Sequence, residues 1–512
     1  MAYGHAMQHS RSIALGTVVM IAIATSACTG DSDTAATTAP TTASPTTVAP
    51  TTGIERPVGP VADLSEELTV GNGAFIGTAV PAALEGTGYV EHEFVAAGTA
   101  TSYRSEQALA ADGHWTFTPD TTADYRTRIV VRRPEHAADF SGTVVMEWLN
   151  VSGGLDANPD YASLREDLVR NGDVWVGVSA QLLGIAGGPV LVSIPGVDAI
   201  AGKGLRGIEP ARYGSLVHPG DGYSFDIFTQ VARAVRAGGP AMGELRPDVV
   251  IAAGESQSAI ALTTYVDGVQ PLTHAFDGFF IHSRAAVALP LVGPGRFADL
   301  AGGLATGATL LRDDADVPII ELQAESDVTG VLGSVAARQP DTERFRLWEV
   351  AGTSHADVHL LGSVSATIDC GGPINNGPMH VVAKAAYRGL VNWIRTGTAP
   401  PAAPRLAVSE GAQPAVQRDA DGIALGGIRT PPVDVPIDVL SGNPRSNPSL
   451  ICLLLGSTTP LPADLLAQRY PSPADYTAAY AASADAAIAA GYVLADDRDA
   501  LLAYADPSRI AG

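Results

Sequence analysis

The chain has 512 residues, 46% of them hydrophobic, and is therefore long enough to bury a large core. It carries 54 acidic and 31 basic residues, which gives a formal net charge of −23 at pH 7, and its only lysines are Lys203 and Lys384. Binding of nucleic acid needs a concentration of positive charge, so this composition excludes a nucleic-acid partner.

The N-terminus has the features of an export signal. Arg11 precedes an apolar stretch at 13–24 that is too short to span a membrane comfortably, and small residues lead to Cys28. We therefore predict a signal peptide at 1–27 that is cleaved before a lipid-modified Cys28. The protein would then be a membrane-anchored bacterial lipoprotein outside the cytoplasm, with simple secretion as the alternative. Residues 28–58, rich in Ser, Thr, Pro and Ala, predict an extended tether.

The predicted anchor can be tested directly on the mature protein. Mass spectrometry should find an N-terminus at Cys28 that carries a diacylglyceryl group. An unmodified mature chain that starts elsewhere would support simple secretion instead.

Strand-like and helix-like segments alternate between residues 59 and 401. Residues 89–103 and 115–133 alternate apolar and polar side chains, which indicates antiparallel strands. Further strands are predicted at 143–149, 173–179, 249–253, 275–284, 317–323 and 345–350, and helices at 223–237, 259–265 and 379–395. This order predicts an α/β core at 59–401, with a mostly parallel central sheet flanked by helices.

Two segments fall outside that alternation. Residues 286–315 are rich in Gly, Ala and Leu without clear periodicity, and an insertion at this place would be positioned to form a cap over a pocket. Residues 402–512 are expected to form a C-terminal appendage that packs on the core.

The most informative motif is Gly-Glu-Ser-Gln-Ser at 254–258, between the predicted strand at 249–253 and the predicted helix at 259–265. A hydrolase serine sits on such a sharp turn so that its hydroxyl is exposed and a neighbouring backbone N–H faces the developing oxyanion. Ser256 is therefore the candidate nucleophile. The motif departs from Gly-x-Ser-x-Gly at Ser258, where serine is the next smallest residue.

Asp327 and His355 each follow a predicted strand, in the chain order Ser, Asp, His. A serine hydroxyl is a weak nucleophile at neutral pH, so we expect His355 to take the proton of Ser256 and Asp327 to orient the imidazole ring. Glu325 is the alternative acid, and His359 is the rival base.

An oxyanion in such a site needs two backbone N–H donors. Gln257, the residue after the nucleophile, is expected to supply one of them. The second is expected from Asn150, Val151 or Ser152, in the glycine-rich loop after the strand at 143–149. The sequence leaves the choice among these three residues open.

The predicted strand at 275–284 ends in polar side chains, and ligands collect at the carboxyl ends of parallel strands. His282 and Arg284 are therefore candidate substrate-binding residues, and Arg284 is of the type that grips a carboxylate.

The three cysteines divide into one at the export signal and two in the body of the chain. If Cys28 is lipidated, Cys370 and Cys452 remain as an even pair in an oxidising compartment, and we predict a disulfide between them. The chain shows no zinc-ligand spacing and no phosphate-binding loop, so neither a metal nor an organic cofactor is expected.

Five segments resemble the family of alpha/beta hydrolase domain proteins, whose members are secreted or surface esterase-like serine hydrolases. The matching segments are 147–154, 254–259, 325–328, 351–356 and 426–431. The resemblance implies an α/β-hydrolase fold with Ser256 as its nucleophile, and it makes Ser258 a family habit. It does not supply a substrate.

Together these features predict an exported serine hydrolase that cleaves small-molecule carboxylic esters through an acyl-serine intermediate. One alternative is an acyltransferase that uses the same three residues. The other is a surface binding lipoprotein that keeps the fold without catalysis.

Overall fold

The computed structural model describes residues 56–78, 80–243, 245–305 and 307–511. Its central element is an eight-stranded sheet. The strands are β1 (Tyr89–Arg104), β2 (Thr118–Pro134), β3 (Thr143–Trp148), β4 (Val174–Val178), β5 (Val249–Glu255), β6 (Gly278–His282), β7 (Ile319–Ala324) and β8 (Phe345–Val350). Every strand predicted from the sequence is present, with its ends at most three residues from the predicted ones.

The strand order in the sheet is β1-β2-β4-β3-β5-β6-β7-β8. Strands β3 to β8 run parallel to one another, and β2 pairs antiparallel with both β1 and β4. Parallel strands that are covered on both faces need nearly continuous apolar residues, and all of Val-Trp-Val-Gly-Val in β4 is buried. The predicted α/β fold with a mostly parallel central sheet is confirmed.

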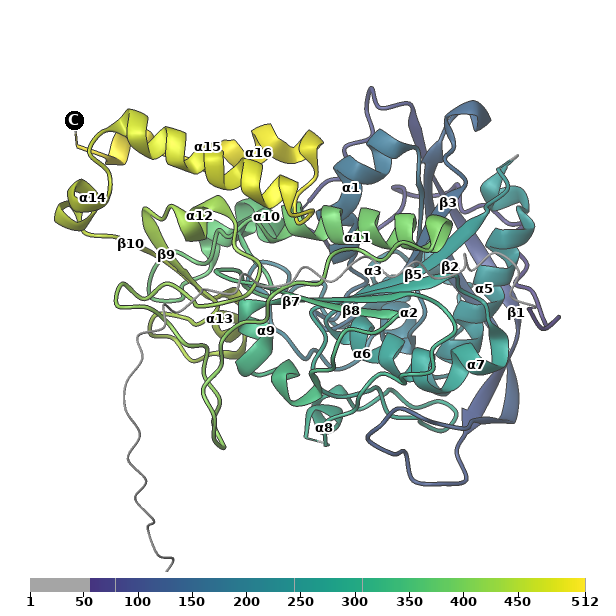
Figure 1. Ribbon diagram of the computed structural model, residues 1–512. Coiled ribbons are helices and arrows are strands. Elements are labelled where there is room, and N and C mark those ends of the chain that lie inside the picture. The colour runs from purple at the N-terminus through teal and green to yellow at the C-terminus, as the bar shows by residue number, and fades with distance from the viewer. Residues whose placement is uncertain (1–55, 79, 244, 306, 512) are drawn as a thin grey trace, which may run out of the picture. The chain divides into compact units, whose positions relative to one another are not determined.

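Helices cover both faces of the sheet (Figure 1). Those up to the end of the predicted core are α1 (Pro159–Asn171), α2 (Leu182–Ala186), α3 (Gly204–Ile208), α4 (Pro210–Tyr213), α5 (Ser224–Ala237), α6 (Gln257–Thr264), α7 (Gln270–Thr273), α8 (Leu300–Leu304), α9 (Glu325–Thr329), α10 (Val358–Leu361) and α11 (Met379–Thr396). Those that follow are α12 (Pro431–Asp434), α13 (Leu450–Leu455), α14 (Ala463–Arg469), α15 (Pro473–Ala489) and α16 (Arg498–Leu502).

The two faces of the sheet form separate hydrophobic clusters. Successive side chains of a strand point to opposite faces, so Val145 of β3 belongs to one cluster and Val144 to the other. Leu164 of α1 and Leu390 of α11 pack in the cluster of Val145, whereas Phe228 of α5 packs in that of Val144. Because β3 to β8 run parallel, their carboxyl ends lie along one edge of the sheet, between these two layers.

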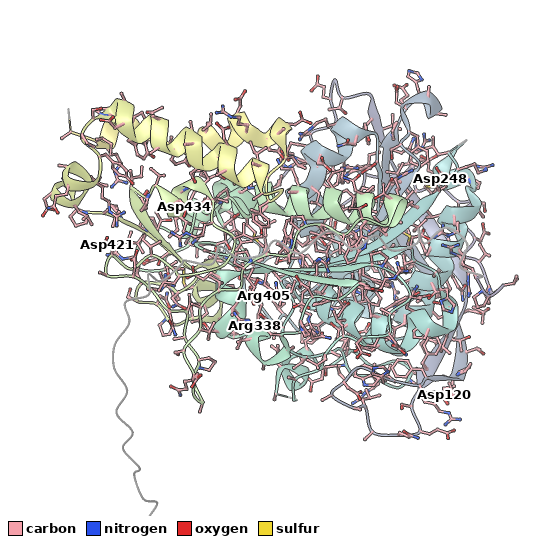
Figure 2. All side chains as sticks on the ribbon, in the orientation of Figure 1. Asp120, Asp248, Arg338, Arg405, Asp421 and Asp434 are labelled. Carbon is pink, nitrogen blue, oxygen red and sulfur yellow. A yellow bond between two sulfur atoms is a disulfide. The ribbon has the colours of Figure 1, made fainter. Side chains whose placement is uncertain are left out.

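The chain after residue 402 packs against the sheet at β8. Ile428 forms a parallel bridge with Val350. The guanidinium of Arg338, labelled in Figure 2, donates to both carboxylate oxygens of Glu349 over 2.7 and 2.8 Å and to the carbonyl oxygen of Leu406 over 3.0 Å. In this part of the chain β9 (Asp438–Ser441) and β10 (Ser457–Pro460) pair antiparallel as a small second sheet.

Cys370 and Cys452 form a disulfide, which confirms the predicted pairing. No helix in the part of the chain that the structure describes is both long and apolar enough to cross a membrane. The predicted signal peptide and Cys28 lie outside the described residues, so export and lipidation stay predictions.

Candidate active site

Ser256 lies on the turn between β5 and α6. Its φ is +62°, a left-handed backbone that a residue with a Cβ adopts rarely, so the surrounding structure must hold it there. The same turn brings two backbone segments together, because a Cβ at Gly254 would lie 2.9 Å from the carbonyl carbon of Ser258. This close approach explains why position 254 is glycine and why position 258 has a small side chain.

Two hydrogen bonds hold this turn from neighbouring elements. The backbone N–H of Ser256 donates to the carbonyl oxygen of His282, at the end of β6, over 2.9 Å. The side-chain amide of Asn150 donates to the carbonyl oxygen of Glu255 over 2.9 Å. These bonds offset part of the cost of the left-handed backbone, which is about 1–3 kcal/mol. The serine is thus fixed between β6 and the loop after β3.

The structure brings the three predicted residues Ser256, His355 and Asp327 into one hydrogen-bonded line. His355 Nε2 lies 2.8 Å from Ser256 Oγ, and His355 Nδ1 lies 2.9 Å from Asp327 Oδ1. The Asp327 carboxylate only accepts hydrogen bonds, so in the neutral ring Nδ1 carries the proton. Nε2 then has its lone pair toward the serine hydroxyl, which is the tautomer able to take a proton from it.

Helix α9, which carries Asp327, is bonded to the loop that carries His355. The second carboxylate oxygen of Asp327, Oδ2, accepts from the backbone N–H of Ala324 over 2.7 Å, which fixes the carboxylate toward the imidazole. The backbone N–H of His355 donates to the hydroxyl of Ser326 over 2.7 Å. Asp327 is fully buried, so water does not compete for its contact with the ring.

Glu325, the alternative acid, has a different set of partners. Its carboxylate accepts from the backbone N–H groups of Gly352 and Gly442, each over 2.8 Å, and pairs with Arg418. These contacts join the start of α9 to the loop after β8 and to the chain after residue 402. The structure therefore places Asp327, and not Glu325, against the ring of His355.

His359, the rival base, is also engaged elsewhere. Its Nε2 lies 3.1 Å from the carbonyl oxygen of Ala162, which can only accept a hydrogen bond, so Nε2 carries a proton. Its ring stacks on that of His380 with the ring centroids 3.6 Å apart. His359 does not line the cavity beside Ser256.

A second carboxylate approaches the imidazole from the serine side. Glu255 Oε1 lies 3.6 Å from His355 Nε2. Burial disfavours charge on the His355 ring, but the carboxylates of Asp327 and Glu255 outweigh it and raise the pKa of His355 to about 9. Burial also raises the pKa of Glu255 to about 7, against the opposing effect of His355 and His282. Shifts of this kind are typical of sites that move protons.

The predicted oxyanion donors differ in how firmly they are already bonded. The N–H of Asn150 donates to the Ala157 carbonyl oxygen, and that of Ser152 donates to Asn150 Oδ1, both over 2.9 Å. The N–H of Val151 has the longest contact, 3.3 Å to Oε1 of Gln257. Gln257 is the first residue of α6, so its own N–H has no acceptor within the helix. Of the three loop candidates, the N–H of Val151 is thus the least firmly bonded, and it points toward Gln257, next to the nucleophile.

The two candidate substrate-binding residues are directed into the protein interior. Arg284 is fully buried, and its Nε donates to the Glu321 carboxylate, on β7, over 2.9 Å. His282 is buried too, with its Nδ1 2.9 Å from Asp160 Oδ1. Neither residue lines the cavity beside Ser256, so the structure does not support the predicted contact with substrate. The polar side chains at the end of β6 instead form buried pairs with acidic side chains of neighbouring elements.

A cavity of about 320 Å³ opens beside Ser256. Among the described residues that line it, the ionisable ones are Glu255 and His355, and much of the remaining wall is apolar. Four of the apolar side chains come from the segment between α2 and α3: Val192, Ile194, Val197 and Ile200. The described residues of 286–315, the segment expected as a cap, contribute none of the lining residues.

One group of side chains in the described part of the chain has the spacing of metal ligands. His114, Asp313 and Asp314 each offer a ligand atom, and these atoms lie within 4.8 Å of one another. All three side chains are exposed, and none lines the cavity beside Ser256.

The sequence interpretation missed two features of this site. One is the contact of Glu255 with the His355 ring. Glu255 lies inside the motif, but the direction of its side chain depends on the geometry of the turn. Its position next to the nucleophile is the only sign of this contact in the sequence. The apolar cavity wall comes from segments without regular periodicity, such as 192–200, and from α13 far along the chain. A hydrophobic pattern does not say which cavity such residues face.

Three comparisons with known proteins bear on the chain. A family model described as "Alpha/beta hydrolase domain" matches residues 56–503. No match was found among the curated proteins.

Solved structures with some similarity include three hydrolases. A fungal esterase from Rhizomucor miehei is 12% identical, with 58% of this chain and 83% of that chain covered and a TM-score of 0.29. A thermostable esterase from Pseudomonas putida is 11% identical, with 60% of this chain and 83% of that chain covered and a TM-score of 0.30. A serine hydrolase without a lid from Xanthomonas campestris is 14% identical, with 49% of this chain and 83% of that chain covered and a TM-score of 0.25. TM-scores at this level support no inference beyond the family match.

Proposed function

Because the chain belongs to the alpha/beta hydrolase domain family, we propose that it hydrolyses carboxylic esters through an acyl intermediate on Ser256. The observation that carries this proposal is the line of hydrogen bonds from Ser256 Oγ through the His355 ring to the buried Asp327 carboxylate. This arrangement supplies a nucleophile, a base and an orienting acid within contact of one another.

In the proposed reaction His355 Nε2 takes the hydroxyl proton of Ser256 while Oγ attacks the carbonyl carbon of the ester. The tetrahedral intermediate collapses when His355 gives that proton to the leaving alkoxide oxygen, and the alcohol departs. A water molecule then attacks the acyl-serine, with His355 again as base. The acid is released, and the proton returns to Ser256. Asp327 stays ionised and stabilises the imidazolium in each step.

The negative charge on the carbonyl oxygen needs donors that are already in place. We assign these roles to the backbone N–H of Gln257 and the backbone N–H of Val151. The first is free of an intrahelical acceptor, and the second would exchange its 3.3 Å contact with the Gln257 side chain for the stronger oxyanion.

Covalent labelling tests the proposal most directly. A fluorophosphonate probe should react with the purified protein, and peptide mapping should find the adduct on Ser256, with loss of p-nitrophenyl ester turnover in step. The Ser258→Ala variant is the matched control, because Ser258 lies in the same turn but its hydroxyl is buried. Turnover of esters without an adduct on Ser256 would contradict the proposal, and so would an adduct on another residue.

The site also predicts an alkaline pH dependence. His355 must be neutral to act as a base, and its pKa of about 9 means that kcat/KM should rise with pH up to about 9. Near that pH Glu255 is ionised, because its own pKa is about 7. Glu255→Gln removes this charge while Asp327 remains, so the pKa of His355 should fall and the rising limb should move to lower pH.

The measurement is the pH profile of kcat/KM for wild type and variant. Asp485→Asn removes an exposed acid that is bonded to Arg498, and its profile should match that of the wild type. A limb that stays in place in Glu255→Gln, or moves to higher pH, would show that Glu255 does not act on the His355 ring.

A further inference from the structure

We propose that the cavity beside Ser256 binds an uncharged, apolar group of the ester, and that helix α13 forms the wall that limits the length of this group. The inference rests on the proposed function and adds a substrate class to it.

The cavity selects for apolar groups because of what lines it. Phe75, Ile76 and Leu155 contribute to its wall, together with the apolar segment 192–200. No Lys or Arg is among the described residues that line it, and Glu255 repels an anion. A carboxylate carried into this cavity would lose its hydration without gaining a partner. The substrate class is therefore an ester with an aliphatic or other apolar group.

The size of the cavity sets the length of that group. One water-sized group occupies about 30 Å³, so a cavity of about 320 Å³ has room for roughly ten methylene-sized groups. Each methylene that moves from water into an apolar cavity should raise kcat/KM about fourfold, until the cavity is full.

Helix α13 lies between the cavity and a buried hydrophobic cluster. Ile451 and Leu454 are three positions apart, lie on one face, and line the cavity. Cys452 and Leu455 lie on the adjoining side of the helix and are buried in a cluster with Cys370, against which Ile451 also packs. The side chains toward the cavity are thus held in place by a packed cluster that contains the disulfide.

The position of this wall is tied to the loop of the catalytic histidine. The disulfide joins Cys452 to Cys370. The backbone N–H of Ala356, next to His355, donates to the carbonyl oxygen of Leu454 over 3.1 Å. That of Asn375 donates to the carbonyl oxygen of Leu455 over 3.0 Å. A wall held at a fixed place relative to His355 can measure the length of a group bound at Ser256.

The experiment compares kcat/KM for two ester series, each normalised to its shortest member. One is p-nitrophenyl esters from acetate to hexadecanoate, and the other is alkyl acetates from ethyl to decyl. Leu454→Trp fills the cavity and should lower the ratio for decanoate over acetate at least tenfold, whereas Leu454→Ala should move the optimum to longer chains. Leu453→Ala changes the same helix at a residue that does not line the cavity, so its profile should match the wild type.

The two ester series show which part of the ester occupies the cavity. A response confined to the alkyl acetates assigns the cavity to the alcohol part of the ester, and a response to the p-nitrophenyl series assigns it to the acyl part. Profiles of both Leu454 variants that match the wild type in both series would overturn the proposal. Where the p-nitrophenyl series responds, efficient cleavage of p-nitrophenyl hydrogen succinate, whose acyl group is charged, would also overturn the proposal.

Binding without turnover keeps the wall testable if no ester is cleaved. Failure of all esters and of the fluorophosphonate probe would reject the proposed function alone. In the Ser256→Ala protein, calorimetry should then still detect ethyl decanoate, and the added Leu454→Trp change should weaken its binding at least tenfold. Equal binding by both proteins would overturn the role of α13.

Discussion

Replacement of Ser256 by alanine should lower kcat for ester hydrolysis by about a million-fold, because the nucleophile and its base act as a unit and the loss of either removes the covalent route. The fold should be unchanged. Alanine has a Cβ like serine, so the left-handed backbone at this position costs about the same in both proteins, and the backbone bond from residue 256 to His282 needs no side chain. Burst and steady-state kinetics, with a thermal melt, measure both results.

The Ser258→Ala variant is the matched control for this loss. Position 258 lies in the same close turn, and alanine is as small as serine, so Gly254 keeps its clearance. Ester turnover near the wild-type rate is expected. If a clean Ser256→Ala preparation keeps its turnover, Ser256 is not the nucleophile, and the geometry around His355 serves some other purpose.

The fold and the positions of the candidate site followed from the sequence for one physical reason. Buried parallel strands have to be nearly continuous apolar runs, so β5, β7 and β8 were readable, and the residues directly after them gather at one edge of the sheet. Ser256, Asp327 and His355 are all of this kind.

The features of the site that the sequence could not predict depend on the direction in which side chains point. The end of β6 was expected to meet substrate, but the charge of Arg284 is matched by Glu321 on the adjacent strand, and that pairing turns the side chain inward. Likewise, the period of a strand does not show that the Glu255 side chain reaches the imidazole. The wall from α13 depends on a contact between residues far apart in the chain, which no local pattern encodes.

The second large effect on turnover is expected from a change to Asp327, the acid that orients His355. Asp327→Asn should lower kcat about ten thousand-fold from neutral to mildly basic pH. The reason lies in the second oxygen of Asp327, which accepts from the Ala324 N–H over 2.7 Å. Asparagine has one carbonyl oxygen, and this donor will claim it. The side-chain NH2 then faces His355 Nδ1, which must give up its proton and accept, so the ring proton moves to Nε2. In that tautomer His355 cannot take the proton of Ser256.

Glu325→Gln is the matched control, and it should fail in a different way. Glu325 is buried and accepts from Gly352 and Gly442, one on each oxygen, so glutamine leaves one backbone N–H without an acceptor and breaks the pair with Arg418. The free energy of unfolding should fall by about 1–3 kcal/mol, while kcat well below the melting temperature stays near that of the wild type. Kinetics at low temperature and a thermal melt of each variant separate the two effects. A reversed ranking, with Glu325→Gln inactive and Asp327→Asn active, would make Glu325 the acid that orients His355.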